Sequence, residues 1–175
     1  MTTKKEIRLE MLLKRKSMSD LEKKRQTQSI IDQIQKMETY QTAKTVSIFY
    51  PMANEIDLRK LRDDHKEILL PRIDNNKMVF HIWTKETKFK TSSFGVAEPI
   101  SGSIFEDRID FMLVPALAIS QDCFRIGYGR GYYDQYINNN RPKLTVGVIY
   151  DFQEVESLPT EPHDQKLDLY VKGSL

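Results

Sequence analysis

Phe111-Met112-Leu113-Val114-Pro115 is followed a few residues later by Arg125-Ile126-Gly127-Tyr128-Gly129-Arg130-Gly131-Tyr132-Tyr133-Asp134. The first stretch predicts a buried strand that Pro115 ends, because a short uninterrupted apolar run is typical of a strand covered on both faces. Residues 132–139 predict a short helix. A strand, a glycine-rich loop and a helix N-terminus in this order predict an α/β fold with an anion site at the loop.

The glycine-rich loop has the residue types that a phosphate site needs. Glycine allows positive φ and a close approach of the backbone, so Gly127, Gly129 and Gly131 could direct N–H groups at phosphate oxygens. Arg125 and Arg130 could neutralise the same oxygens. The spacing matches neither the P-loop nor the dinucleotide-binding turn. A glycine-rich surface turn, or a single-stranded nucleic-acid binder that stacks bases on tyrosines, therefore remains open.

The rest of the chain alternates predicted helices with short apolar strands. Apolar spacing predicts a first helix that breaks near Ser17, and the capping-box form of Ser19 to Glu22 begins a second helix that ends near Glu38. Asp57 could cap a short helix. Further strands are predicted at 45–50, 67–70, 78–83, 144–149 and around 170–171. The alternation predicts one three-layer α/β/α domain over residues 1–175 with a largely parallel sheet.

Three of these strands are predicted to end at a proline, namely Pro51, Pro71 and Pro115. Open α/β sheets bind ligands at the carboxyl ends of their strands. The three loops and the glycine-rich loop are therefore expected to line one cleft.

Composition narrows the class of protein. The 175 residues are 39% apolar and 30% charged, and no apolar run approaches the roughly 20 residues of a membrane span. We expect no membrane partner and, with no apolar signal core at the start, a cytoplasmic protein. The single cysteine, Cys123, excludes an internal disulfide. Residues 1–25 carry nine Lys or Arg against four Asp or Glu, which fits either a solvated basic helix or attraction of a polyanion.

The chain resembles one family, the 5-formyltetrahydrofolate cyclo-ligases, also called 5,10-methenyltetrahydrofolate synthetases. The segments that carry the resemblance span nearly the whole chain: Lys4-Lys5-Glu6-Ile7-Arg8, Tyr50-Pro51 with Glu55, Leu70-Pro71-Arg72, Phe94-Gly95-Val96-Ala97-Glu98-Pro99, Val114-Pro115 with Ala118, Arg125 to Asp134, and Leu158-Pro159 with His163-Asp164. Each segment alone is weak, but their order and spacing are specific.

The resemblance implies a single α/β domain that uses ATP as co-substrate and Mg²⁺ as cofactor to convert 5-formyltetrahydrofolate into 5,10-methenyltetrahydrofolate, with release of ADP and phosphate. The ATP-binding residues that it implies are Lys4, Lys5, Glu6, Ile7, Arg8, Arg125, Ile126, Gly127, Tyr128, Gly129, Arg130, Gly131, Tyr132 and Tyr133. The folate-binding residues that it implies are Phe49, Tyr50, Glu55, Tyr128, Gly129, Arg130, Gly131 and Tyr132. Arg125, Arg130 and Tyr132 are expected to be catalytic, and Asp134 and Asp164 to hold Mg²⁺.

The sequence departs from the family pattern at three places. Ala118-Ile119-Ser120 stands where the family commonly has Ala-Phe-Asp, and Cys123 where it has glycine, so these departures affect the local turn and remove one carboxylate of the family pattern. Arg130 replaces a more usual glycine or lysine, which keeps a compatible charge.

The implied reaction explains why no protein nucleophile is needed. A formamide oxygen leaves poorly, but after it accepts the γ-phosphoryl group N10 can attack the activated carbon, and ring closure expels phosphate. Phosphoryl transfer depends on positioning and charge neutralisation, which Lys, Arg, backbone N–H groups and Mg²⁺ supply.

Other interpretations of the same residues remain. Glu55 could cap the following helix, and Asp164 could be a turn residue. A nucleic-acid-binding module is the main alternative function, and an ATP-dependent kinase or ligase acting on another small molecule is the next. We expect small-molecule substrates, no nucleic-acid partner and a monomer.

Overall fold

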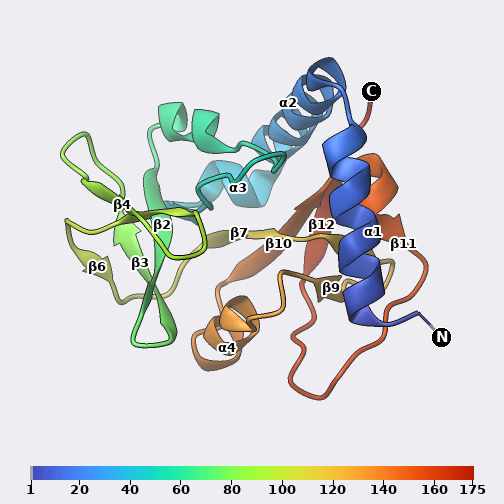
Figure 1. Ribbon diagram of the computed structural model, residues 1–175. Helices are drawn as coiled ribbons and strands as arrows, with labels where there is room; N and C mark the ends of the chain where they lie inside the picture. Colours follow the sequence, from blue (N-terminus) through green and yellow to red (C-terminus); the bar gives the residue numbers. More distant parts are fainter. Residues whose placement is uncertain (1) are drawn as a thin grey trace.

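The computed structural model describes residues 2–175, and its centre is a seven-stranded sheet (Figure 1). In spatial order the strands are β12 (Leu169–Lys172), β10 (Leu144–Ile149), β7 (Phe111–Pro115), β1 (Thr45–Ser47), β2 (Glu67–Asp74), β3 (Lys77–Ile82) and β6 (Ile104–Phe105). The first five strands pair in parallel, whereas β3 is antiparallel to both β2 and β6. The sheet is therefore largely parallel, as predicted.

Alternation along the buried strands separates two hydrophobic clusters, one on each face of the sheet. Phe111 and Leu113 of β7 belong to the first cluster, and Met112 and Val114 belong to the second. Successive side chains of a strand point to opposite faces, so an apolar run such as β7 is covered on both sides. Burial on both faces explains why this strand has no polar position.

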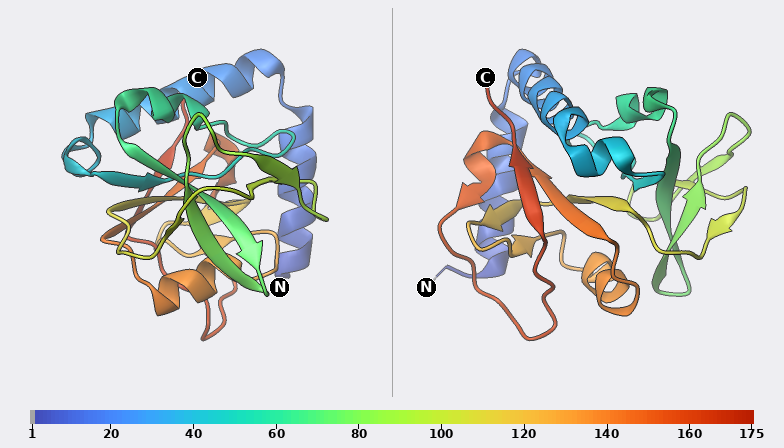
Figure 2. Two further views of the ribbon diagram at one scale, coloured as in Figure 1. Left: turned by 90° about the vertical axis from the view of Figure 1, so that its left-hand side faces the viewer. Right: turned by 180° about the vertical axis from the view of Figure 1, so that it is seen from behind.

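Helices α2 (Asp20–Lys36) and α3 (Glu38–Thr42) cover the first face, and α4 (Tyr132–Asn139) lies on the other (Figures 1 and 2). Ser19 caps α2 with a complete capping box, as the sequence predicts. Tyr40 of α3 meets Phe111 edge to face at 5.3 Å between ring centroids. On the opposite face, Tyr136 of α4 meets Phe80 at 4.9 Å. These aromatic contacts fix the two outer layers on the sheet.

A small three-stranded sheet extends the α4 side and supports the N-terminal helix. Its strands, in order, are β11 (Glu154–Val155), β8 (Ala118–Ser120) and β9 (Arg125–Ile126). Helix α1 (Lys4–Ser17) packs Ile7 and Met11 against Leu117, Ala118 and Ile126. Because β9 leads directly into the glycine-rich loop, α1 lies beside that loop.

The remaining elements are short. They are the 3-10 helices η1 (Arg59–Asp64) and η2 (Asp151–Gln153) and the hairpin of β4 (Phe89–Thr91) with β5 (Ala97–Pro99). No helix among residues 2–175 is long and apolar enough to cross a membrane.

The fold class and the main elements are confirmed, with four local corrections. β1 ends at Ser47 and does not continue to Pro51 as predicted. Pro71 does not end a strand, since β2 continues to Asp74 and Pro71 pairs with Phe80. The β1 pairing reaches only Leu69, so the missing N–H of Pro71 removes no bond to β1. The predicted polar connection at residues 85–90 runs into β4, and the predicted second helix ends at Lys36, before α3. The sequence also did not indicate β5, β6, β8, β9 or β11.

Candidate active site

A cavity of about 840 Å³ opens where β1 and β7 end, next to the glycine-rich loop. Phe49 and Tyr50 follow β1 and Pro115 ends β7, so the carboxyl ends of parallel strands contribute to the wall, as expected for an open α/β sheet. The other lining residues come from α1, the segment after β1, β2, β3, the β4–β5 hairpin, the glycine-rich loop with the first residues of α4, and the segment before β12: Lys4, Arg8, Met52, Glu55, Pro71, Ile73, Met78, Ser92, Phe94, Val96, Glu98, Arg125, Ile126, Gly127, Tyr128, Gly129, Arg130, Gly131, Tyr132, Tyr133, Asp134, Glu161, His163 and Asp164.

The glycine-rich loop lies against Arg8 of α1. The Nε of Arg8 donates to the Gly127 carbonyl at 2.8 Å. Gly129 has φ +99°, and a Cβ at that position would lie 3.3 Å from the Cζ of Arg8. A Cβ on Gly127 would collide with the Arg125 guanidinium. Glycine at both positions lets backbone and guanidinium groups come this close, and at Gly129 it also suits the positive φ.

Arg125 is a partly buried cation at the base of the loop. Its Nη1 donates to the Pro115 carbonyl at 3.0 Å, and its guanidinium lies 5.3 Å from the centroid of the Tyr133 ring. Its Nε is buried without a hydrogen-bond partner among the described residues. Burial lowers the pKa of Arg125, and the nearby Asp134, Tyr133 and Asp164 oppose that effect. A buried cation with a spare donor is suited to an anionic ligand.

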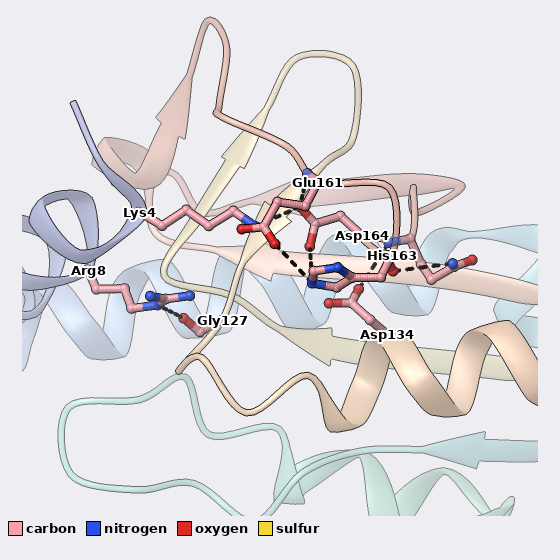
Figure 3. Close-up of polar contacts among 8 residues, drawn as sticks. Lys4, Arg8, Gly127, Asp134, Glu161, His163 and Asp164 are labelled. Carbon is pink, nitrogen blue, oxygen red and sulfur yellow. Dashed lines mark hydrogen bonds and ion pairs between the residues drawn. The ribbon is translucent and has the colours of Figure 1, made fainter. Parts of the chain in front are cut away.

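Lys4 and Asp164 form a mostly buried ion pair on the same wall (Figure 3). The Nζ of Lys4 lies 2.7 Å from Oδ2 of Asp164 and 3.4 Å from Oε1 of Glu161, and the Asp164 side chain is 10% exposed. Burial raises the pKa of Asp164, but the Lys4 contact and the Glu161 N–H outweigh it, so the pKa lies below its usual value. Asp164 thus stays ionised, and it also accepts from Glu161 as a turn residue would.

Asp134 lies near this pair, at the start of α4, and its Oδ1 accepts from the Gln165 N–H at 3.1 Å (Figure 3). No group of three or more His, Cys, Asp or Glu side chains that could hold a metal occurs within residues 2–175. Mg²⁺ is usually bound by one or two carboxylates, with phosphates and waters completing the shell. The carboxylates of Asp134 and Asp164 fit a metal that arrives with phosphates, and not a cage built by protein alone.

Glu55 forms the opposite corner of the cavity. Its Oε1 accepts from the Met52 N–H and its Oε2 from the Tyr128 hydroxyl, each at 3.0 Å. Burial raises the pKa of Glu55 despite these bonds and the charge of Arg15. Asp57, not Glu55, accepts the Arg59 N–H that begins η1, so the interpretation of Glu55 as a helix cap is wrong. Glu55 is a carboxylate directed at the glycine-rich loop.

Three of the residues predicted to bind ATP do not line the cavity. Lys5 is exposed, Glu6 completes the capping box of α1 with Thr3, and Ile7 is buried against the small sheet. All the other predicted site residues line it. Their roles remain predictions.

Several lining residues were not assigned a role from the sequence. Phe94, at the tip of the β4–β5 hairpin, lies 4.0 Å from the Arg130 guanidinium, measured to the ring centroid. Glu161 and His163 precede Asp164 and face the Lys4 pair. Phe94 and His163 stand in segments that carry the family resemblance, and that signal could have indicated them. Arg15 does not line the cavity but bonds the Tyr128 hydroxyl from outside it, and it gave no signal in the sequence, since it stands within an ordinary basic helix.

Comparison with known proteins agrees with this architecture. Residues 1–172 match the model of the 5-formyltetrahydrofolate cyclo-ligase family. A Mycoplasma genitalium protein named 5-formyltetrahydrofolate cyclo-ligase is 30% identical, with 98% of each chain covered. The solved structure of Aquifex aeolicus 5,10-methenyltetrahydrofolate synthetase superimposes with a TM-score of 0.86 at 30% identity, covering 97% of this chain and 89% of that one. The Mycoplasma pneumoniae synthetase gives 0.78 at 25% identity, covering 97% and 98%. The chain therefore belongs to the 5-formyltetrahydrofolate cyclo-ligase family.

Proposed function

We propose that the protein converts 5-formyltetrahydrofolate into 5,10-methenyltetrahydrofolate at the expense of ATP, with release of ADP and phosphate. The observation that carries the proposal is one cavity in which a cationic glycine-rich loop faces a carboxylate and aromatic side chains. A nucleotide and a second, ring-containing substrate need these two kinds of wall next to each other.

The nucleotide side of the cavity is assigned to α1 and the glycine-rich loop. Lys4, Arg8, Arg125 and Arg130 supply positive charge there, and the loop from Arg125 to Tyr133 supplies backbone N–H groups. Cations and oriented N–H groups stabilise the negative charge that spreads over a phosphoryl group during its transfer. Arg125, Arg130 and Tyr132 are the residues we assign to catalysis.

The folate side is assigned to Phe49, Tyr50 and Glu55. The Tyr50 ring lies 6.4 Å from Trp83 and 5.4 Å from Phe89, measured between centroids, with the ring planes tilted by 55° and 56°, so two aromatic neighbours support the Tyr50 ring beside the carboxylate. A pterin ring is planar and carries N–H donors, so it can stack on aromatic side chains while Glu55 accepts its hydrogen bonds. The residues from Tyr128 to Tyr132 reach both substrates.

The reaction follows from holding the two substrates in line. The formyl oxygen attacks the γ-phosphorus of ATP, the bond to the bridging oxygen breaks, and ADP leaves. The carbon is then an iminium bearing phosphate, which the N10 amine attacks. Loss of the N10 proton and of inorganic phosphate leaves the N5–CH–N10 amidinium of the product. Positioning the reactants and excluding water are the tasks of this chain.

Asp134 and Asp164 would hold Mg²⁺, which when bound neutralises phosphate charge. Lys4 pairs with Asp164, so this carboxylate is kept ionised for such a role.

We propose further that residues 1–175 act as one domain and as a monomer, in the cytoplasm where ATP and folates are available. A role in binding nucleic acid is not supported, because the arginines of the glycine-rich loop contact protein groups inside the cavity.

The experiment is to mix the protein with ATP, Mg²⁺ and 5-formyltetrahydrofolate and to follow near-ultraviolet absorbance, where the methenyl product absorbs. The proposal predicts a rise that requires ATP and that is matched by ADP. A protein that binds an oligonucleotide with a steep salt dependence, and that gives no absorbance change, would support the nucleic-acid alternative instead. ADP formation with another acceptor would support a different ATP-dependent enzyme.

A further inference from the structure

Helix α1 carries a third basic residue, Arg15, which lies behind the wall of the cavity. Lys4, Arg8 and Arg15 lie on one side of this helix, and Arg15 is only 2% exposed. A guanidinium seldom lies buried without specific partners, because desolvation of a charge is costly. Arg15 belongs neither to the nucleotide wall nor to the folate wall as assigned above.

Arg15 donates hydrogen bonds to the glycine-rich loop and to the residue after β7. Its Nη1 donates to the Tyr128 hydroxyl at 3.0 Å, and its Nη2 donates to the Ala116 carbonyl at 2.8 Å. Its Nε is buried without a partner among the described residues. A cation that served only to hold the fold would be expected to use all its buried donors.

The bond from Arg15 determines which way the Tyr128 hydroxyl points. A guanidinium can only donate, so the phenol oxygen must accept from Arg15 and its own proton is free for another acceptor. That acceptor is Oε2 of Glu55, at 3.0 Å. The chain Arg15–Tyr128–Glu55 therefore has a single direction of donation, and the second oxygen of Glu55 is held by the Met52 N–H.

The same guanidinium is the cation that acts on Glu55. Burial raises the pKa of Glu55, whereas the charge of Arg15, the Met52 N–H and the Tyr128 hydroxyl lower it. The titratable groups around this corner include Tyr133 of α4 and Tyr150 after β10, whose phenols are neutral at ordinary pH because burial raises their pKa. Glu55 also lines a second pocket, together with Asp20, Lys23, Lys24, Arg25, Asp57 and Lys60. Among the charged groups, Arg15 is the one whose charge lowers the pKa of Glu55.

We propose that Arg15 is a positioning residue for the folate side of the reaction, which orients Tyr128 and keeps Glu55 a carboxylate that can accept from the substrate. This inference rests on the proposed function. It adds a residue outside the cavity wall to the determinants of folate binding.

The test compares Arg15→Met, Arg15→Lys and Lys16→Met. Lys16 is the matched control, because it lies on the exposed side of the same helix and loses the same charge. Steady-state constants for 5-formyltetrahydrofolate and for ATP are measured separately, together with thermal unfolding. For Arg15→Met we expect the folate KM to rise about tenfold or more, as loss of a charge-assisted hydrogen bond network implies, and the ATP KM to change less than twofold.

The pH profile of kcat/KM for folate separates positioning from folding. In Arg15→Met the pKa of Glu55 rises further, so the acidic limb of the profile moves to higher pH. Arg15→Lys keeps the charge but loses the planar fork whose two nitrogens bond Tyr128 and Ala116 separately, so its limb stays near that of the unmodified protein while its folate KM rises. If Arg15→Met does not fold, Arg15→Lys alone tests the proposal. In a Glu55→Gln background, Arg15→Met should cause no further loss of folate binding.

If Arg15→Met changes the KM for folate and the KM for ATP equally and leaves the acidic limb of the pH profile in place, the proposal is overturned and Arg15 has only a structural role. A folate KM for Arg15→Met no different from that of Lys16→Met would overturn it as well. An unmodified protein that does not cyclise 5-formyltetrahydrofolate would instead refute the proposed function.

Discussion

Replacing Gly129 with alanine should damage ATP binding more than stability. Gly129 has φ +99°, which lies beyond the left-handed region that other residues tolerate. Such a backbone costs about 1 to 3 kcal/mol for a residue with a side chain. Alanine recovers about 0.4 to 1 kcal/mol by restricting the unfolded chain. We therefore expect Gly129→Ala to lower the free energy of unfolding by at most about 2.6 kcal/mol.

The new methyl group also meets Arg8. It would lie 3.3 Å from the Cζ of Arg8, whose Nε is bonded to the Gly127 carbonyl at 2.8 Å, so the guanidinium must shift by a few tenths of an ångström. Arg8 is assigned to the ATP phosphates, and a hydrogen bond to a charged group contributes about 1.5 to 3 kcal/mol, so displacing this guanidinium should raise the KM for ATP by roughly tenfold or more.

Gly102→Ala is the matched control. Gly102 has φ +89° and a would-be Cβ contact of 3.5 Å to the Ile82 carbonyl, but it does not line the cavity. The two variants should lose similar stability in urea titrations, and only Gly129→Ala should lose ATP affinity. If both variants bind ATP equally well at temperatures where both are folded, the assignment of the glycine-rich loop to the nucleotide is wrong.

Three further changes test other parts of the site. Lys4→Gln breaks a mostly buried ion pair with Asp164 and should lower the free energy of unfolding by about 1 to 3 kcal/mol; an unchanged urea midpoint would show that the pair contributes nothing. Lys4 lowers the pKa of Asp164 in the folded protein. The ion pair therefore stabilises the fold above the pKa that Asp164 has in the unfolded chain, and this stabilisation is lost as the pH falls through its pKa in the folded protein. The variant and the unmodified protein should therefore converge in stability in acid. Because the pKa of Glu55 is raised, the acidic limb of the pH profile of kcat/KM for folate should lie above the ordinary pKa range of glutamate. Glu55→Gln should abolish that limb and leave ATP affinity nearly intact. A limb that persists in this variant would belong to another group. Asp134→Asn should raise the Mg²⁺ concentration needed for half-maximal activity and lower kcat, and a normal response to limiting Mg²⁺ would remove Asp134 from the metal site.

The parts of the fold that depend on local pattern were predictable from the sequence. The apolar run at 111–115 and the capping box at Ser19 each determine an element through neighbouring residues alone, and α4 begins and ends where its residues predict. Pro71 was misread because a proline ends a strand only where its N–H would be needed. That requirement depends on where β1 stops, which is a tertiary fact.

The site was predictable where glycine and charge mark it, and not where a partner is distant in sequence. Gly127 and Gly129 are needed because two arginines approach the backbone, and the loop itself contains one of those arginines. Arg15 lies more than a hundred residues from Tyr128, and its burial depends on how α1 packs on the small sheet. Nothing in the spacing of charges along α1 distinguishes Arg15 from its exposed neighbours.

The most direct test of the account follows the formyl oxygen itself. If the protein is given ATP, Mg²⁺ and 5-formyltetrahydrofolate labelled with a heavy isotope in the formyl oxygen, mass spectrometry of the released inorganic phosphate should find one labelled oxygen for each methenyl product formed. Label that appears in water and not in phosphate, with the methenyl product still accumulating, would contradict phosphorylation of the formyl oxygen.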